Sequence, residues 1–253
     1  MVPMLASSPA GIGVGSQRVL IALIDIDTNQ LAASPEIEVV ATLRDRIGSP
    51  LDEYPGEFVW IIPDVRGLYA FNFEIPGPGT FQVTLNADSL GNLGPIGLVA
   101  VAEPPVVGVG DTAPLSVTRT SADHALADIT SDPEPDPGFY ELTVAEAVRS
   151  GPSVIIFATP AWCVSQACGP MLDQVKGLAA DYPGLSFVHV EVYEDIHVSN
   201  VEDLVYVPSV FEWGLVAEPW IFVTDSSGRV SHSFEGAVSD RELAEAFDLA
   251  LSS

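Results

Sequence analysis

The sequence is poor in positive charge. Its 253 residues include 9 Lys and Arg against 35 Asp and Glu, which gives a formal net charge of −26 at pH 7, and Lys176 is the single lysine. A surface this acidic repels phosphate groups, so it argues against nucleic acid binding and against a polybasic membrane-surface role. It fits a salt-rich surrounding, in which ions screen the self-repulsion, and it equally fits an ordinary soluble acidic protein.

Long apolar runs and cysteines are also scarce. No window approaches the roughly 18 consecutive apolar residues of a membrane-spanning helix, so no such segment is expected. The start of the chain lacks the basic and apolar pattern of a secretory signal peptide. Two cysteines, Cys163 and Cys168, cannot build a disulfide framework. Hydrophobic residues, by contrast, make up 47% of the chain. They are enough to form a buried core, so the chain as a whole is not disordered.

The first hundred residues carry the alternation of β-strands. Apolar residues recur at every second position, and turn-forming residues separate the runs. A Pro-Gly-Pro-Gly cluster at 76–79 predicts a hairpin between 67–75 and the alternating run that follows it. The other expected strands are 18–25, 36–45 and 97–102. Short strands, frequent turns and the lack of a helical period before about residue 140 favour an antiparallel β-sandwich.

The pattern changes in the second half. The prolines at 104 and 105 mark the expected domain boundary, and the proline-rich run 131–137 predicts an extended surface loop. Beyond it, a helix, a strand, a helix, three strands and a helix follow one another. The expected helices are 143–149, 168–180 and 239–251, and the expected strands are 154–158, 186–192, 220–223 and 230–235. Thr143 is the expected N-cap of the first helix, and a capping box opens the last.

Several residues in this order resemble the thioredoxin-like superfamily. Trp162 and Cys163 directly follow a buried strand, and Pro170 falls where helices of that family carry a kinking proline. Pro219, just before a strand, matches the cis-proline loop that faces the family's active site. The resemblance spans roughly residues 113–253.

The resemblance of the second half and the strand pattern of the first half together predict a fold class for the whole chain. We predict two domains: an N-terminal all-β, immunoglobulin-like sandwich over 1–105 and a C-terminal α/β thioredoxin-like fold over 139–253. A linker and extended lead-in over 106–138 would join them. Sandwich modules of this kind occur fused to exported redox proteins, which predicts an extracytoplasmic or cell-envelope location, with the cytoplasm as the alternative.

The spacing of the two cysteines departs from the Cys-x-x-Cys of that family. Five residues of ideal helix rise ~7.5 Å and turn ~140°, whereas a disulfide needs Cα atoms within ~4.4–6.8 Å. Cys163 and Cys168 therefore cannot be bridged inside one regular helix. Either 164–167 is a loop and the helix begins near Cys168, or the helix frays on oxidation. Gly169 and Pro170 favour the loop, because proline suits the first helical turn.

Two assignments of the thiol chemistry stay open. In the first, Cys163 is the nucleophile, activated by the start of the helix, and Cys168 resolves the mixed disulfide. In the second, the Cys168-Gly-Pro-Met171 run resembles the thioredoxin Cys-Gly-Pro-Cys with its last cysteine replaced, and the roles are exchanged. The first keeps Trp162 and Pro170 in step with the family and is preferred. Two packed core cysteines without chemistry are the alternative to both.

The predicted function is thiol–disulfide exchange with an exported protein or a small thiol. Cys163 forms the mixed disulfide and Cys168 resolves it. The resemblance implies that Pro219 holds the partner's backbone and that Trp162 shields the site. We expect no cofactor and no metal. The sequence offers no identifiable acidic or lysine proton acceptor, which predicts weak activity.

Three other functions stay open. Peroxidases of the bacterioferritin-comigratory type are similar around the first cysteine, but they carry Thr or Ser where this chain has Pro160. They also pair that cysteine with an arginine, for which Arg149 and Arg229 are the only candidates near the strands of the second half. A Sco-like copper chaperone would combine the thiols with His197 or His232. The third is a non-catalytic interaction module whose cysteines are structural.

Overall fold

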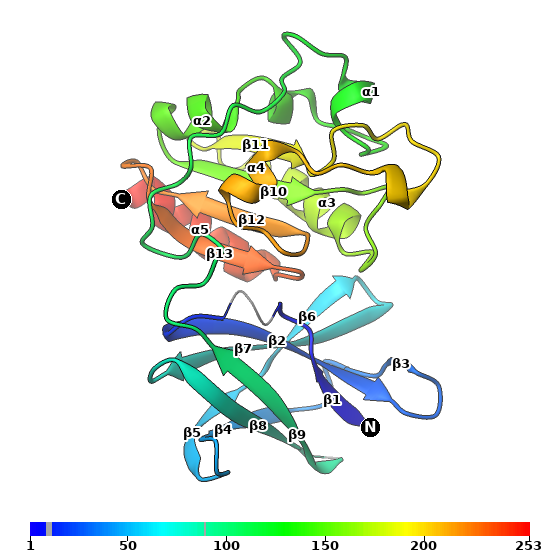
Figure 1. Ribbon diagram of the computed structural model, residues 1–253, viewed down its shortest axis with the longest axis vertical. Helices are drawn as coiled ribbons and strands as arrows, with labels where there is room; N and C mark the ends of the chain where they lie inside the picture. The colour runs from blue at the N-terminus through cyan, green and yellow to red at the C-terminus, as the bar shows by residue number, and fades with distance from the viewer. Residues whose placement is uncertain (9–11, 89) are drawn as a thin grey trace. The chain divides into compact units, whose positions relative to one another are not determined.

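Figure 1 shows the computed structural model, which describes residues 1–8, 12–88 and 90–253. The chain forms two compact units, Met1–Pro105 and Val106–Ser253. The first unit has one cluster of buried hydrophobic residues, and the second has two, one on each face of its sheet.

The first unit is a β-sandwich. One sheet has the order β1-β2-β7-β6, with β3 paired to β2, and the other has the order β5-β4-β8-β9. Every pair is antiparallel, and alternate side chains of both sheets meet in one core around Leu23, Leu43, Phe71 and Leu85. The strands are β1 Val2–Leu5, β2 Gly15–Asp25, β3 Gln30–Leu31, β4 Val39–Arg44, β5 Pro50–Pro55, β6 Glu57–Ile62, β7 Arg66–Ile75, β8 Gly79–Ala87 and β9 Gly91–Ala100.

The hairpin expected across 76–79 is wrong. β7 pairs with β2 and β6, whereas β8 pairs with β4 and β9. The chain crosses from one sheet to the other at the Pro-Gly cluster instead of returning beside β7. Alternating burial is the same for a hairpin and for two strands that face each other across a core, so the pattern could not separate the two arrangements.

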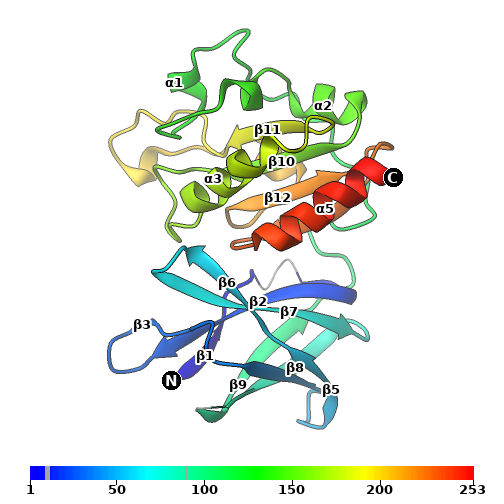
Figure 2. The same cartoon turned by 180° about the vertical axis from the view of Figure 1, so that it is seen from behind.

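The second unit is built on a mixed four-stranded sheet of order β11-β10-β12-β13. β10 and β11 are parallel, and the other two pairs are antiparallel. Helices α3 and α5 pack on one face of this sheet (Figure 2), the face that carries Val154 and Ile156. Helices α2 and α4 pack on the other face, which carries Ile155 and Phe157. The strands are β10 Ser153–Ala158, β11 Ser186–Glu191, β12 Trp220–Thr224 and β13 Val230–Glu235. The helices are α1 Leu126–Ile129, η2 Pro137–Tyr140, α2 Val144–Ser150, α3 Cys168–Ala179, η3 Val201–Asp203, α4 Pro208–Glu212 and α5 Asp240–Ser252.

Local signals set the helix ends as the sequence predicts. The Thr143 hydroxyl accepts the Glu146 N–H while the Glu146 carboxylate accepts from the Thr143 backbone, so α2 opens with a capping box. Ser239 and Glu242 do the same for α5. Helix α2 ends before Gly151, whose φ of 148° lies in the range that favours glycine. These polar contacts satisfy N–H groups that would otherwise lack partners.

The segment 106–138 belongs to the second unit. Val106 and Ala113 are buried in the cluster that also holds the α2 face of the sheet. The N–H of Gly110 donates to the Val230 carbonyl at 2.8 Å, and the N–H of Ala113 donates to the Gly228 carbonyl at 3.0 Å. The lead-in is thus packed along the edge of the fold.

The predicted fold class, an immunoglobulin-like sandwich joined to an α/β thioredoxin-like fold, is contradicted. The chain is mostly β, with 37% of it in strands and 19% in helices, and its three sheets are antiparallel or mixed. The second unit is not a clear α/β thioredoxin domain. Within the described chain only β10 and β11 are parallel, and α2 and α4 have seven and five residues. The order of elements along the sequence did not reveal α4 or the strand directions, which long-range packing sets.

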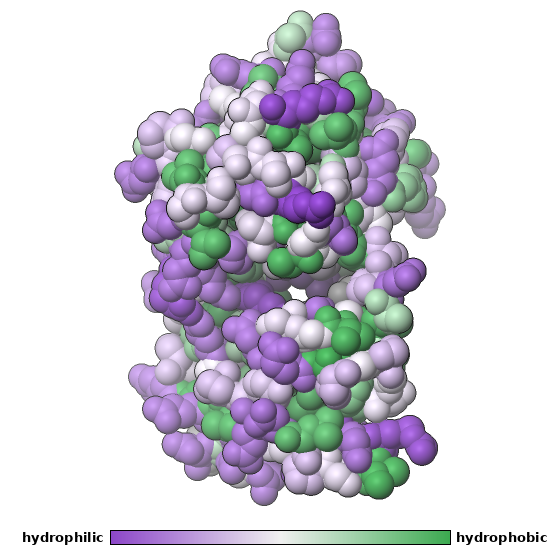
Figure 3. Space-filling view, turned by 90° about the vertical axis from the view of Figure 1, so that its left-hand side faces the viewer, coloured by the Kyte–Doolittle hydropathy of each residue, from purple (hydrophilic) through white to green (hydrophobic). Residues whose placement is uncertain are grey.

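The surface drawn in Figure 3 is largely hydrophilic, with apolar side chains scattered over it. This agrees with the acidic composition. Among the described residues, no helix has the length and apolar character needed to cross a bilayer, and α5, with 13 residues, is the longest.

Candidate functional site

A disulfide joins Cys163 and Cys168, with 6.0 Å between their Cα atoms. Residues 164–167 form a loop, and α3 begins at Cys168. Gln166 within the loop has a φ of 58°, which turns the chain back toward the helix. The structure thus selects the loop over a frayed helix, because a regular helix would separate the two sulfurs too far.

The two sulfurs lie in different surroundings. Cys168 is fully buried and packs in the same cluster as Met171 and Leu172, whereas Cys163 is half-buried at its edge. The N–H of Cys168, at the start of α3, donates to the Cys163 sulfur at 3.3 Å, and the Ser165 hydroxyl lies 3.2 Å from the same sulfur. A helix N-terminus and a hydroxyl donor favour negative charge, so a reduced Cys163 is placed to be a thiolate.

A buried carboxylate is tied to the disulfide segment. Glu191 ends β11 and is 5% exposed. Its Oε2 accepts hydrogen bonds from the Ser131 N–H at 2.9 Å and from the Ser131 hydroxyl at 2.6 Å. The same Ser131 oxygen accepts the N–H of Ala161 at 3.1 Å. Glu191 is therefore linked through one serine to the backbone two residues before Cys163.

Two acidic groups at this end of the sheet are held toward their neutral forms. Burial raises the pKa of the Glu191 carboxyl, while Ser131 and the nearby Thr159 hydroxyl oppose the rise. Burial also raises the pKa of Glu218, and the charge of Glu191 adds to that rise. The charge of Glu191 thus acts on Glu218, which places two carboxyl groups with raised pKa values at this end of the sheet.

Trp162 and Pro219 lie at the same end of the sheet. Phe157 near the carboxyl end of β10 is paired with Trp220 of β12, which places Pro219 beside the point where the Cys163 segment leaves β10. The Glu218–Pro219 bond is cis, as the sequence predicts. The Trp162 Nε1–H donates to the Ile196 carbonyl at 3.3 Å, which anchors the ring next to the disulfide loop. The roles predicted for both residues stay predictions.

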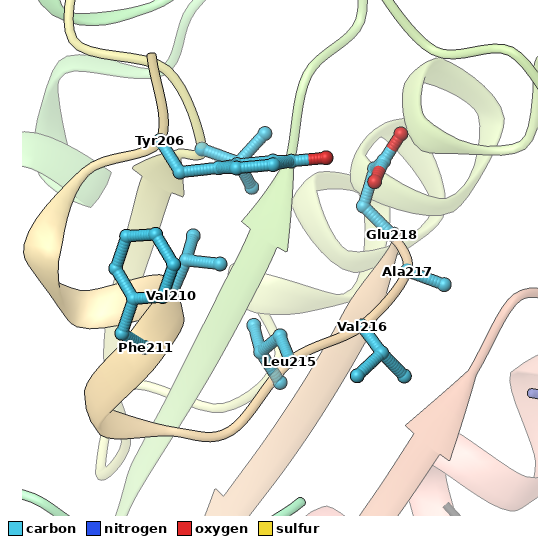
Figure 4. Close-up of a pocket in the computed structure, with 8 residues that line it drawn as sticks. Tyr206, Val210, Phe211, Leu215, Val216, Ala217 and Glu218 are labelled. Carbon is cyan, nitrogen blue, oxygen red and sulfur yellow. The ribbon is translucent and has the colours of Figure 1, made fainter. Parts of the chain in front are cut away.

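A shallow apolar hollow of about 90 Å³ adjoins this end of β12. Figure 4 shows its wall of aliphatic and aromatic side chains, with the Tyr206 hydroxyl pointing toward the side on which Glu218 lies. Phe211, on its rim, is 71% exposed. The hollow places exposed apolar surface next to Pro219.

His189 is a core residue with all its ring nitrogens bonded. It is 3% exposed, its Nε2 lies 3.1 Å from the Ala158 carbonyl, and its Nδ1 lies 2.8 Å from the Tyr140 hydroxyl. That hydroxyl also bonds to the Thr130 hydroxyl at 3.0 Å. Burial lowers the pKa of His189 to about 4, so the ring is neutral at pH 7.

The residues proposed for the alternative functions have other partners or positions. His197 pairs with Asp128 at 3.2 Å, and His232 bonds to its neighbour Ser231. Across the described residues, no group of three or more His, Cys, Asp or Glu side chains is arranged to hold a metal ion. Arg149 and Arg229 flank the opposite end of the sheet, where Ser153 at the start of β10 pairs with Thr224 at the end of β12.

Sequence reasoning missed Glu191 and Ser131. The strand pattern treats Glu191 as one more residue of 186–192, although a carboxylate at the end of a strand whose last four residues are buried is itself a signal. Ser131 lies in a proline-rich run that reads as a surface loop. No sequence signal placed it against β11, because the contact joins residues 60 apart.

The chain matches no protein-family model and no curated protein. Among solved structures it is similar to a crystal structure of the Lin-41 filamin domain, with 12% sequence identity and a TM-score of 0.26 over 40% of this chain and 93% of that one. A likeness at that level supports no argument, so the functional argument rests on the site itself.

Proposed function

We propose that the chain exchanges disulfides with a thiol-bearing partner through Cys163 and Cys168. The observation that carries the proposal is the asymmetry of the pair. One sulfur is half-buried and receives an N–H from the start of α3, and the other is fully buried behind it. An attacking thiolate needs access and stabilisation, and a resolving thiol needs proximity and protection from competing partners.

The reduced protein exchanges with a partner disulfide in two steps. The Cys163 thiolate attacks one sulfur of a partner disulfide, an S–S bond forms between them, and the partner's other sulfur leaves as a thiolate that takes up a proton. The Cys168 thiol then loses its proton and attacks Cys163, which re-forms the intramolecular disulfide and releases the second partner thiolate. Two electrons pass from the protein to the partner, and the reverse sequence oxidises a dithiol.

Glu191 is the group we assign to the proton of Cys168. Burial raises its pKa, which makes it a stronger proton acceptor than an ordinary carboxylate. Ser131 links the carboxylate to the disulfide segment and fixes its orientation. The proposal thus supplies the proton acceptor that the sequence did not reveal.

The partner and setting are part of the same proposal. The partner we propose is a protein or small-molecule thiol or disulfide outside the cytoplasm, where disulfides form and persist. The β-sandwich is assigned immunoglobulin-like character on its strand pattern and two facing antiparallel sheets, and it would present the partner or anchor the chain at the cell envelope.

The test uses mass-mapped alkylation of the intact protein across a glutathione redox series, with C163S, C168S and the double variant. We expect a reversible bridge in the wild type, a glutathione adduct on Cys163 that accumulates in C168S, and little adduct in C163S. The double variant sets the background. A bridge that resists reduction throughout, or adducts that form equally on both cysteines, would contradict the exchange and indicate a structural disulfide.

A further inference from the structure

A cavity of about 130 Å³ runs along β11 on the side of the lead-in segment. Its walls come from 117–119 of the lead-in, from 189–191 at the end of β11, and from 207–209 before and within α4. Arg119 and Glu194 at one end are exposed, and the guanidinium of Arg119 donates to the Glu194 carbonyl. The cavity therefore extends from the surface to the buried end of β11.

Two buried polar atoms in this wall have no partner among the described residues. The Ser209 hydroxyl belongs to a residue that is 4% exposed, and Glu191 Oε1 to one that is 5% exposed. Glu191 Oε2 is satisfied by Ser131, so the orphan oxygen is the other one. The Thr159 hydroxyl is near enough to affect the pKa of Glu191 but does not meet hydrogen-bond geometry with it.

Buried polar groups without a protein partner favour bound water. A buried donor or acceptor without a partner is costly, and native proteins satisfy such groups with ordered water when the space is polar and roomy enough. One water needs about 10–15 Å³ of space for its centre and two to four polar partners. The cavity has room for several, and Ser209, Glu191 and Thr118 line it with polar groups.

We propose that this cavity is a hydration site whose water molecules bond to Ser209 and Glu191 and give the Glu191 carboxyl a proton route to solvent that avoids the disulfide. The route rests on the proposed exchange function. In the resolving step the proton of Cys168 goes to the Glu191 carboxylate, and the carboxylic acid then passes a proton to the water chain and on to bulk solvent at Arg119 and Glu194.

The position of the cavity explains when a second proton route would matter. A bulky partner bound at Cys163 covers the disulfide side, which Glu191 faces through Ser131. Glu191 also lines the cavity, and its orphan oxygen is the one that Ser131 does not bond, so this route would reset Glu191 while the partner is still bound. A small disulfide leaves the first side open and does not need the second route.

The test compares Ser209→Val with Ser209→Thr in the full chain. The two side chains have the same shape, but only threonine keeps the hydroxyl. Reduced protein is mixed with insulin as a bulky disulfide and with glutathione disulfide as a small one. We expect S209V to lose insulin reduction severalfold relative to S209T, with equal rates on glutathione disulfide. Equal insulin rates in the two variants would overturn the route.

A second readout is independent of redox activity. A high-resolution crystal structure of the wild type should show ordered water within hydrogen-bonding distance of both Ser209 Oγ and Glu191 Oε1, and S209V should lose the water at Ser209. A side chain seated on Glu191 Oε1 in place of water would overturn the hydration site. Water at both atoms in a protein that reduces neither disulfide would overturn the exchange function and the route, and would confirm the hydration site alone.

Discussion

Ser131 and Glu191 are joined by two hydrogen bonds, from the serine N–H at 2.9 Å and from its hydroxyl at 2.6 Å, both to the same carboxylate oxygen. The residues are 60 positions apart, and the serine comes from a proline-rich run. The serine oxygen also accepts the Ala161 N–H. This serine therefore fixes the carboxylate and the disulfide segment at the same time.

Removal of the Ser131 hydroxyl should destabilise the protein. Ser131→Ala leaves the Ala161 N–H without its acceptor and takes one donor from a buried carboxylate, which costs about 2 kcal/mol of unfolding free energy. Ser131→Thr keeps the hydroxyl and is the control. Urea unfolding at pH 7 measures both, and an S131A variant as stable as the wild type would contradict the inferred contact.

Glu191 should make the protein less stable as the pH rises. Burial raises its folded pKa above the ordinary 4.5, so the folded state binds the proton more tightly. The contribution is fully present below 4.5 and is lost as the pH rises through the raised value. Glu191→Gln keeps an acceptor for Ser131 and removes the charge, so the stability of the variant relative to the wild type should increase over that range. Glu218 leaves a residual slope of the same sign in both proteins. Chemical denaturation at closely spaced pH values tests the difference.

Protonation of His189 should make the protein less stable as the pH falls, the opposite pH dependence to that of Glu191. Burial lowers its folded pKa from 6.5 to about 4, so its contribution is present above 6.5 and is lost as the pH falls through about 4. Full protonation costs roughly 3 kcal/mol. His189→Gln retains an amide donor for the Ala158 carbonyl and cannot be protonated, so its stability curve should be flatter between these values. Curves of unfolding free energy against pH that run parallel for the wild type and H189Q would refute the lowered pKa of His189.

The single lysine forms ion pairs with one buried and one exposed carboxylate. Lys176 Nζ lies 2.7 Å from Asp132, whose side chain is 4% exposed, and 2.8 Å from Asp173, whose side chain is 70% exposed. Burial works against the charge of Lys176, but the hydrogen bonds to both carboxylates outweigh it and raise its pKa. Asp132→Asn should cost about 2 kcal/mol, and Asp173→Asn less than about 0.5 kcal/mol. Thermal unfolding of the two variants compares them, and equal costs would show that burial does not matter here.

Reduction of the disulfide should have two measurable effects. The closed loop is short, so its loss lowers the unfolding free energy by about 2 kcal/mol. In the reduced protein, Cys163 should react with iodoacetamide before Cys168, since only Cys163 reaches the surface. Timed alkylation followed by peptide mapping gives the order. Faster labelling of Cys168 would reverse the assigned roles.

Local structure was largely predictable. The capping residues Thr143 and Ser239 mark helix starts in the sequence, and the structure places helices there. The cysteine spacing excluded a bridge within one helix, and the bridge indeed spans a loop. These predictions held because caps, turns and helix rise depend on residues a few positions apart.

Tertiary relationships were not predictable in the same way. The partners of β7 and β8, the class of the second unit, and the packing of 106–138 against it depend on which apolar faces meet. The amino-acid order by itself determined the acidic charge, the strand and helix segments and the one pair of cysteines. Only the tertiary structure decided that Cys168 is buried, that Cys163 is within reach of solvent, and that Glu191 is a buried acid linked through Ser131 to the disulfide segment, because burial and pKa arise from contacts between residues far apart in the chain.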